Sequence, residues 1–323
     1  MRLGTTIPTY CTGDQLVPSP AIDRWVRRAE GIGFDGLWVL DHIVKPDLYN
    51  TSVLDALSAL NYAAGITDDI DLGTSIYILP LRRTAAVASQ ALTLQHLANG
   101  DVTLGLGIGY VPEEFEVTGV DMRERGPRLT EGIEVLQAFF DGETSFDGEF
   151  HEFTDVRIDP VLDDPPDILA GGGSTQEDDG ERTVPRPILD RILDAGGWIA
   201  PPSHPEKAAA EWDLISEHAR RNDVDPESLD RVMLSYAHVP DAAASDPRSE
   251  QRRVFEELFS PKRGFDHAEQ HCLVGSVDEI TDRLEAYEEI GFDEIILGAA
   301  ASDPDTLDEQ LDRFEEDLLP RFE

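Results

Sequence analysis

The sequence has few cysteines and no long hydrophobic run. Only Cys11 and Cys272 stand in 323 residues, which is too few for a disulfide framework or a cysteine-rich metal cluster. No apolar segment approaches the roughly 20 residues that a membrane-spanning helix needs. Residues 1–4 read as the start of a strand and not as a signal peptide. We therefore expect a cytoplasmic protein with no membrane partner.

Basic residues are scarce relative to acidic ones. Lys plus Arg number 26 and Asp plus Glu number 66, so the formal net charge is −40. Such a chain repels phosphates, which argues against nucleic acids and anionic membranes as partners. The acidic residues are spread along the chain and 40% of residues are hydrophobic, so global disorder is not expected. We interpret the acidic surface as that of a halophilic protein, because a high-salt cytoplasm screens self-repulsion over a few ångströms.

The segment from Asp71 to Glu114 has the pattern strand, helix, strand. Residues 72–79 are uncharged and end at Pro80, which is typical of a strand buried on both faces. Residues 84–97 repeat apolar side chains at three- and four-residue steps, as in a helix that covers a sheet. Residues 102–109 form a second apolar run, with glycines that allow a close approach of backbone or ligand. The unit indicates a parallel sheet with its chemistry at the carboxyl ends of the strands.

Strand and helix signals alternate along the whole chain, with a polar hairpin expected in residues 141–156 and a helix expected to begin at Ser52. No second run of strands marks a separate domain. We therefore predict an α/β fold, a (β/α)8 TIM barrel with insertions, in which residues 1–323 form a single domain. Strands are expected at residues 3–8, 36–40, 72–79, 102–109, 167–170, 197–200, 231–239 and 294–297.

Two short motifs that follow strands are candidates for chemistry. Asp41-His42 lies at the end of the second strand, where an imidazole titrating near pH 6.5 can exchange a proton and an adjacent carboxylate can orient it. Gly171-Gly172-Gly173-Ser174 follows the fifth strand and could bind a phosphate through backbone N–H groups and a hydroxyl. The simpler alternatives are a loop cap with a structural histidine, and a flexible glycine turn.

The remaining polar signals are weaker. Tyr110 and Glu114 could face a substrate or lie in a solvated loop. Gly105, Gly107 and Gly109 lie inside a strand, so they indicate packing against a ring and not a dinucleotide fingerprint. The histidines lack the spacing and the carboxylates of a zinc site, and we expect no metal.

Five blocks in order resemble the bacterial luciferase-like monooxygenase superfamily, and within it the branch that uses the deazaflavin coenzyme F420. The third- and fourth-strand unit described above is one of these blocks. The others are AEGIGFDGLWVLDH at 29–42, ILAGGGS at 168–174, GGWI at 196–199 and GSVDEITDRLEAYEEIGFDEIIL at 275–297. Together they cover most of the chain.

The resemblance implies where a cofactor and a substrate would bind. A flavin or deazaflavin ring would lie across the carboxyl ends of the strands, backed by a bulged third strand with a non-proline cis peptide at Ser75-Ile76. It also implies a small-molecule substrate and, as an expectation that rests on the resemblance alone, a homodimer. The implied catalytic residues are Asp41, His42 and Tyr110, and the implied cofactor-binding residues are Ser75, Ile76, Ile78, Gly107, Ile108, Ala170, Gly171, Gly172, Gly173 and Ser174.

The sequence departs from the family pattern at three places. IVKPD follows His42 without a tryptophan, and Tyr110 stands where the sugar-phosphate dehydrogenases of the branch carry a glutamate. The connection after Ser174 is also longer and more acidic than is usual in the family.

The leading functional hypothesis is an oxidoreductase that passes hydride between F420 and a small organic substrate, with the redox chemistry supplied by the coenzyme. The alternatives are an FMN-dependent luciferase-like monooxygenase and a redox-silent flavin-binding barrel. A metal-dependent barrel hydrolase is disfavoured because the first strand, RLGTTIP, has no HxH ligand pair.

Overall fold

The computed structural model describes residues 1–12, 16–45, 51–176, 182–241, 244–259, 263–301 and 303–322. Eight strands close into a barrel in the order β1-β14-β13-β12-β9-β6-β5-β3, and every neighbouring pair is parallel. This confirms the predicted (β/α)8 barrel. The barrel strands are β1 (Arg2–Thr6), β3 (Gly36–Val39), β5 (Asp71–Ile78), β6 (Val102–Gly107), β9 (Asp167–Gly171), β12 (Gly197–Ala200), β13 (Asp230–Ala237) and β14 (Glu294–Ala299).

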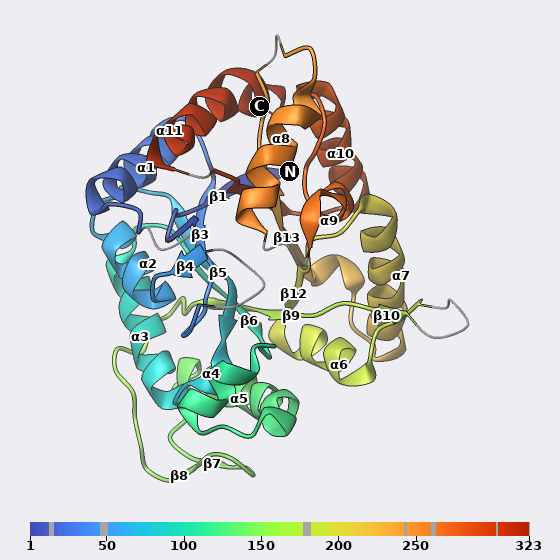
Figure 1. Ribbon diagram of the computed structural model, residues 1–323. Helices are drawn as coiled ribbons and strands as arrows, with labels where there is room; N and C mark the ends of the chain where they lie inside the picture. Colours follow the sequence, from blue (N-terminus) through green and yellow to red (C-terminus); the bar gives the residue numbers. More distant parts are fainter. Residues whose placement is uncertain are drawn as a thin grey trace.

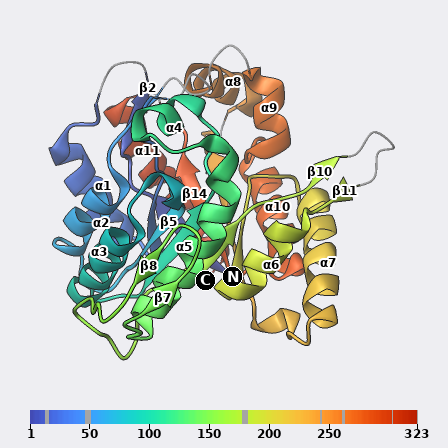
Figure 2. The same ribbon diagram turned by 90° about the horizontal axis from the view of Figure 1, so that it is seen from below.

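Helices surround the barrel (Figures 1 and 2). Their apolar side chains are buried in one core together with side chains of the strands. Their ends follow ordinary capping rules: α10 starts with a capping box between Ser276 and Glu279, and Gly291 ends it in the left-handed conformation. The helices are α1 (Ser19–Gly31), α2 (Ala56–Ala64), α3 (Thr84–Leu97), α4 (Pro112–Thr118), α5 (Arg125–Phe140), α6 (Arg186–Ala195), α7 (Pro205–Arg221), α8 (Pro247–Leu258), α9 (Gly264–His271), α10 (Val277–Ile290) and α11 (Pro304–Arg313).

In the described part of the chain, three short antiparallel pairs lie outside the barrel: β2 (Tyr10–Thr12) with β4 (Thr51–Val53), β7 (Phe146–Asp147) with β8 (Glu152–Phe153), and β10 (Thr175–Gln176) with β11 (Arg182–Thr183). The β2–β4 pair corrects one prediction, because Ser52 lies in a strand. The helix begins later, at Ala56, where the Asp55 side chain accepts a hydrogen bond from the backbone N–H of Ser58. The sequence cue for a cap was therefore Asp55.

The predicted polar hairpin is present as β7–β8, and it is held to the helical layer. The Glu131 carboxylate of α5 accepts hydrogen bonds from the backbone N–H groups of residues 149–151. The His151 ring bridges Glu131, at 2.8 Å from Nδ1, and Thr84 of α3, at 2.7 Å from Nε2. Phe153 stacks on Phe139 of α5 with centroids 4.6 Å apart. Polar and aromatic contacts together fix this insertion.

Trp38 fills the amino-terminal end of the barrel interior. Its indole Nε1 donates to Glu294 Oε1 at 2.6 Å, and Trp38 and Glu294 are 3% and 4% exposed. A Cβ atom at Gly4 or Gly36 would collide with the Glu294 carboxylate or the indole, and one at Gly73 would collide with the indole. Glycines on three adjacent strands therefore make room for one tryptophan and one buried carboxyl group.

Burial raises the pKa of Glu294 to about 7, against the attraction of Arg2 and the hydrogen bond from Trp38. This group lies at the first residue of β14, at the end of the barrel opposite the carboxyl ends of the strands. It belongs to the packing of the fold and not to the candidate site described next.

Candidate active site

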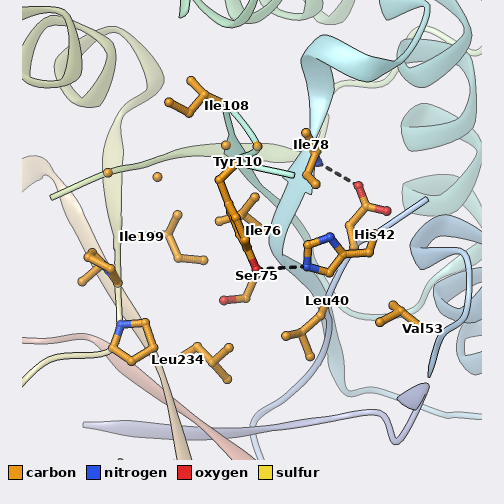
Figure 3. A pocket seen from close by; sticks show the side chains of 18 of the residues that line it. Leu40, His42, Val53, Ser75, Ile76, Ile78, Ile108, Tyr110, Ile199 and Leu234 are labelled. Atoms are coloured by element: carbon orange, nitrogen blue, oxygen red, sulfur yellow. Dashed lines mark hydrogen bonds between the residues drawn. The ribbon is translucent and has the colours of Figure 1, made fainter. Parts of the chain in front are cut away.

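A cavity of about 410 Å³ opens at the carboxyl ends of the barrel strands (Figure 3). Active sites of (β/α)8 barrels lie at this end, where loops from several strands converge. The lining of the cavity comes from β4, β5, β6, β9, β12, β13, α5, α8, the loop after β3 and the other loops beside these elements: Leu40, Asp41, His42, Val53, Ser75, Ile76, Ile78, Gly107, Ile108, Gly109, Tyr110, Arg125, Gly171, Gly172, Ile199, Ala200, Pro201, Pro202, Leu234, Tyr236 and Leu258.

Strand β5 is bulged beside the cavity. The peptide between Ser75 and Ile76 is cis, as predicted, and the pairing with β6 shifts register between Ser75 and Tyr77. The Ile76 side chain then lies over Gly107, where a Cβ atom would meet it at under 3 Å. The missing side chain at Gly107 therefore lets Ile76 form one wall of the cavity.

His42 is held by a carboxylate on one side and faces a phenol on the other. Its Nδ1 lies 3.1 Å from Glu114 Oε1. Its Nε2 lies 3.5 Å from the Tyr110 hydroxyl, a contact drawn in Figure 3. The two rings meet edge to face with centroids 5.7 Å apart. From the sequence we expected the adjacent Asp41 to orient the imidazole. In the structure, the carboxylate that contacts the ring is Glu114.

Glu114 is fully buried and accepts the backbone N–H of Ile43 at 2.6 Å. Burial acts to raise its pKa, but hydrogen bonds from His42 and from the N–H groups of Ile43 and Val44 outweigh burial, so the pKa is lowered. A carboxylate at this position favours a proton on Nδ1 of His42, which leaves the Nε2 lone pair toward the cavity.

Asp41 also lines the cavity, but its oxygens are both engaged. Oδ2 accepts a hydrogen bond from the backbone N–H of Ile78 at 2.8 Å, and Oδ1 accepts one from Arg82 Nη2 at 2.7 Å. Burial raises its pKa, and the attraction of Arg82 opposes the rise. The Asp41 carboxylate therefore links the loop after β3 to the end of β5. Through this link it can position the neighbouring residue, His42.

The glycine loop after β9 supplies only part of the cavity lining. Gly171 and Gly172 line the cavity, whereas Ala170 is buried in β9 and neither Gly173 nor Ser174 belongs to the lining. The backbone N–H and the hydroxyl of Ser174 both donate to Glu211 Oε1, each at 2.6 Å. The two donors that we expected to bind phosphate are thus already occupied.

Glu211 comes from α7, is fully buried, and lies 3.6 Å from Lys207 Nζ. Ser174 therefore stays a predicted cofactor-binding residue, whose donors are held in this structure by a buried side chain 37 residues downstream.

Several lining residues were missed by sequence reasoning. Ile199, Leu234 and Tyr236 lie on β12 and β13, so the strand-end rule could have found them. Arg125, the first residue of α5, lies in the run RERGP at 123–127, which is similar to the F420 branch but was not assigned to the site, and Leu258, the last residue of α8, carries no local motif. Among the described residues, no group of three or more His, Cys, Asp or Glu side chains is placed to hold a metal ion. Within the same residues, no helix is long and apolar enough to cross a membrane.

Comparisons with known proteins agree with this architecture. The model of the luciferase-like monooxygenase family matches residues 1–294. The F420-dependent glucose-6-phosphate dehydrogenase of Amycolatopsis mediterranei is 24% identical over 338 residues, covering 96% of each chain. A solved F420-dependent secondary alcohol dehydrogenase, in complex with an F420-acetone adduct, superposes with a TM-score of 0.81 at 19% identity, over 100% of this chain and 99% of the other. An FMN complex is also similar in fold: the oxygenating constituent of 3,6-diketocamphane monooxygenase from Pseudomonas putida has a TM-score of 0.71 at 16% identity, over 99% and 98% of the chains.

Proposed function

Because the chain belongs to the luciferase-like monooxygenase family, we propose that it is an oxidoreductase that passes hydride between coenzyme F420 and a small organic substrate. The observation that carries the proposal is the cavity at the carboxyl ends of the strands, with the bulged strand β5 on one wall and a histidine hydrogen-bonded to a carboxylate at its edge. Similarity to F420-dependent relatives over nearly the whole chain supports the choice of coenzyme.

The residues of the cavity fit a flat, largely apolar ring. Ile76 and Ile108 offer apolar surface, and the absence of side chains at Gly107 and Gly171 makes room for the Ile76 side chain at the cavity wall. When bound, the coenzyme supplies a carbon centre that accepts or gives hydride. The protein contributes a shaped cavity that excludes water and holds the substrate in line. Gly172 is the nearest part of the glycine loop that remains available, since Ser174 is bound to Glu211.

His42 is the candidate for proton transfer. Its Nδ1 is bonded to Glu114, so Nε2 is the nitrogen that can take a proton from a substrate hydroxyl or return one to a carbonyl oxygen. Tyr110 can hydrogen-bond the same oxygen, because its hydroxyl lies 3.5 Å from Nε2. Asp41 positions the loop after β3 through its hydrogen bonds to Ile78 and Arg82 and takes no part in the proton transfer.

Titration with F420 and with FMN in molar salt tests the coenzyme. We expect F420 to bind more tightly, measured by the change in its own fluorescence. Gly107→Ala should weaken F420 binding, because the added Cβ displaces Ile76, whereas Gly31→Ala, which meets nothing within 4 Å, is the matched control. Circular dichroism of both variants shows whether the fold is kept.

The outcomes separate the alternatives. Tight FMN binding with oxygen consumption and no response to F420 would replace the proposal with an FMN-dependent monooxygenase, which the fold also accommodates. A bound coenzyme with no turnover of any substrate would indicate a redox-silent flavin-binding barrel.

We also propose that residues 1–323 act as one domain in a high-salt cytoplasm. The charge of −40 supports the salt adaptation, and one large hydrophobic core that spans the barrel and its helices supports a single unit. A homodimer remains a prediction from the family resemblance.

A further inference from the structure

The cavity has one polar edge and one apolar wall. His42, Tyr110 and Ser75 lie along the polar edge. The apolar wall consists of Leu40, Val53, Ile199, Leu234 and Leu258, which come from the end of β3, from β4, β12 and β13, and from α8. In Figure 3, Ile199 and Leu234 lie across the cavity from His42. A ligand that fills this space meets polar groups at one end and hydrocarbon along its body.

Positive charge is sparse in the cavity. Of the lining residues in the described part of the chain, only Arg125 is a lysine or arginine, and its Nη1 donates to the Met122 carbonyl at 3.0 Å. The Asp41 carboxylate accepts hydrogen bonds from the Ile78 N–H and from Arg82. A phosphate dianion placed here would lose its water without enough cationic partners, inside a chain of net charge −40.

Hydrogen-bonding capacity is also limited. Each hydroxyl of a sugar needs a partner when it is buried, because an unpaired buried polar group costs about 1 to 3 kcal/mol. The apolar wall offers hydrocarbon at each of its five residues, with Tyr236 beside it as a polar side chain. A polyol would therefore leave most of its hydroxyls unpaired against this wall.

The volume sets a limit on size. Ligand cavities commonly measure about 300 to 1,000 Å³, and this one, at about 410 Å³, lies at the low end. It would have to hold the coenzyme ring as well as the substrate. The substrate is therefore small.

Resting on the proposed function, we propose that the substrate is a small, uncharged alcohol with a hydrocarbon body, or its carbonyl product, and not a sugar phosphate. In the oxidative direction the C–H bond of the carbinol carbon breaks with its electron pair, and the hydride passes to oxidised F420. The O–H proton passes to Nε2 of His42. The alcohol is thereby oxidised to a ketone or aldehyde, and the coenzyme is reduced.

The test is a substrate series with the holoenzyme in molar salt. Reduction of F420 is followed with 2-propanol, 2-butanol and 2-pentanol, and separately with glucose and glucose 6-phosphate. Burial of one methylene is worth about 0.8 kcal/mol, so kcat/KM should rise about fourfold per added carbon until the wall is covered. Neither sugar should give measurable reduction.

Leu234→Ala and Leu258→Ala test the apolar wall. Each should lower kcat/KM for 2-pentanol by about tenfold, mainly through KM, and should flatten the dependence on chain length. The affinity for F420 should not change. Leu97→Ala on α3, whose side chain is 56% exposed, is the control. The melting temperature of each variant shows whether a lower kcat/KM reflects a lost substrate contact or a destabilised fold. Two wall positions are tested so that one variant remains informative if the other does not fold.

The results also distinguish this inference from the proposed function. If direct titration detects no F420 binding, the proposed function fails and the inference fails with it. If F420 binds but glucose 6-phosphate is the better substrate, or no alkanol is oxidised, or kcat/KM is independent of chain length, the inference fails and the coenzyme assignment stands.

Discussion

Replacing Glu294 by glutamine should change how the stability of the barrel depends on pH. Glu294 is 4% exposed, and burial raises its pKa to about 7 from an unperturbed 4.5. Glutamine keeps an oxygen that can accept the Trp38 indole N–H, and it removes the titrating group. Glu294→Gln therefore isolates one ionisation with little change in packing.

The sign and the magnitude follow from the two pKa values. Below pH 4.5 the carboxyl group is protonated in both the folded and the unfolded chain, so ionisation contributes nothing. Between 4.5 and about 7 the unfolded chain releases its proton and the folded chain keeps it, so stability falls as pH rises. A difference of about 2.5 pKa units at 1.36 kcal/mol each gives a loss of about 3 kcal/mol, complete above pH 7. The variant should not show this loss.

Urea unfolding in molar salt, followed by circular dichroism across this pH range, measures the effect, because urea leaves the ionic strength constant. The informative quantity is the free energy of unfolding of the variant minus that of the wild type, in which the other titrating groups cancel. It should increase by about 3 kcal/mol from pH 4.5 to above pH 7. Glu285→Gln, at an exposed position on α10, should give a flat difference. Parallel curves for wild type and Glu294→Gln would refute the reasoning.

Three further predictions concern the site and the surface. His42→Ala should lower kcat by about 10²- to 10⁴-fold with little change in melting temperature, and an unchanged kcat would mean that His42 only lines the cavity. Glu211→Gln should tighten F420 binding by about tenfold in a fluorescence titration, because it removes a negative charge from the donors of Ser174. Exposed Glu217→Gln on the same helix is its control, and equal affinities would show that the phosphate lies elsewhere. Removal of salt should lower the melting temperature and finally unfold the chain of charge −40, so full stability in dilute buffer would contradict salt adaptation.

The barrel could be predicted because its signals are local and repeated. Runs such as residues 72–79 and 102–109 are uncharged and bounded by turn residues, and helical stripes stand between them. The boundaries at Ser52 and Asp55 were missed because the β2–β4 pairing is a contact between distant segments. The strand signal there is three residues long, which is too short to outweigh a helical pattern.

The candidate site was predicted in part for the same reason. His42 and Gly107 come at the ends of recognisable strands, Ser75 and Ile76 lie in the second half of another, and a barrel brings these strand ends together. Glu211 could not be foreseen at the glycine loop, since which face of α7 reaches which loop is decided by tertiary packing. Tertiary packing also decides which carboxylate contacts His42. Glu114 lies beside the imidazole, whereas Asp41 accepts a hydrogen bond from Arg82.

Closure of the barrel bears on whether the protein aggregates at high salt concentration. Screening by salt removes the repulsion that would otherwise keep such acidic molecules apart in solution. An open sheet would then present unpaired backbone N–H and C=O groups along its edges, which are templates for aggregation. The eight barrel strands leave no such edge, and the three accessory pairs are only two or three residues long. We therefore expect colloidal stability in brine to depend on the closed topology at least as much as on net charge.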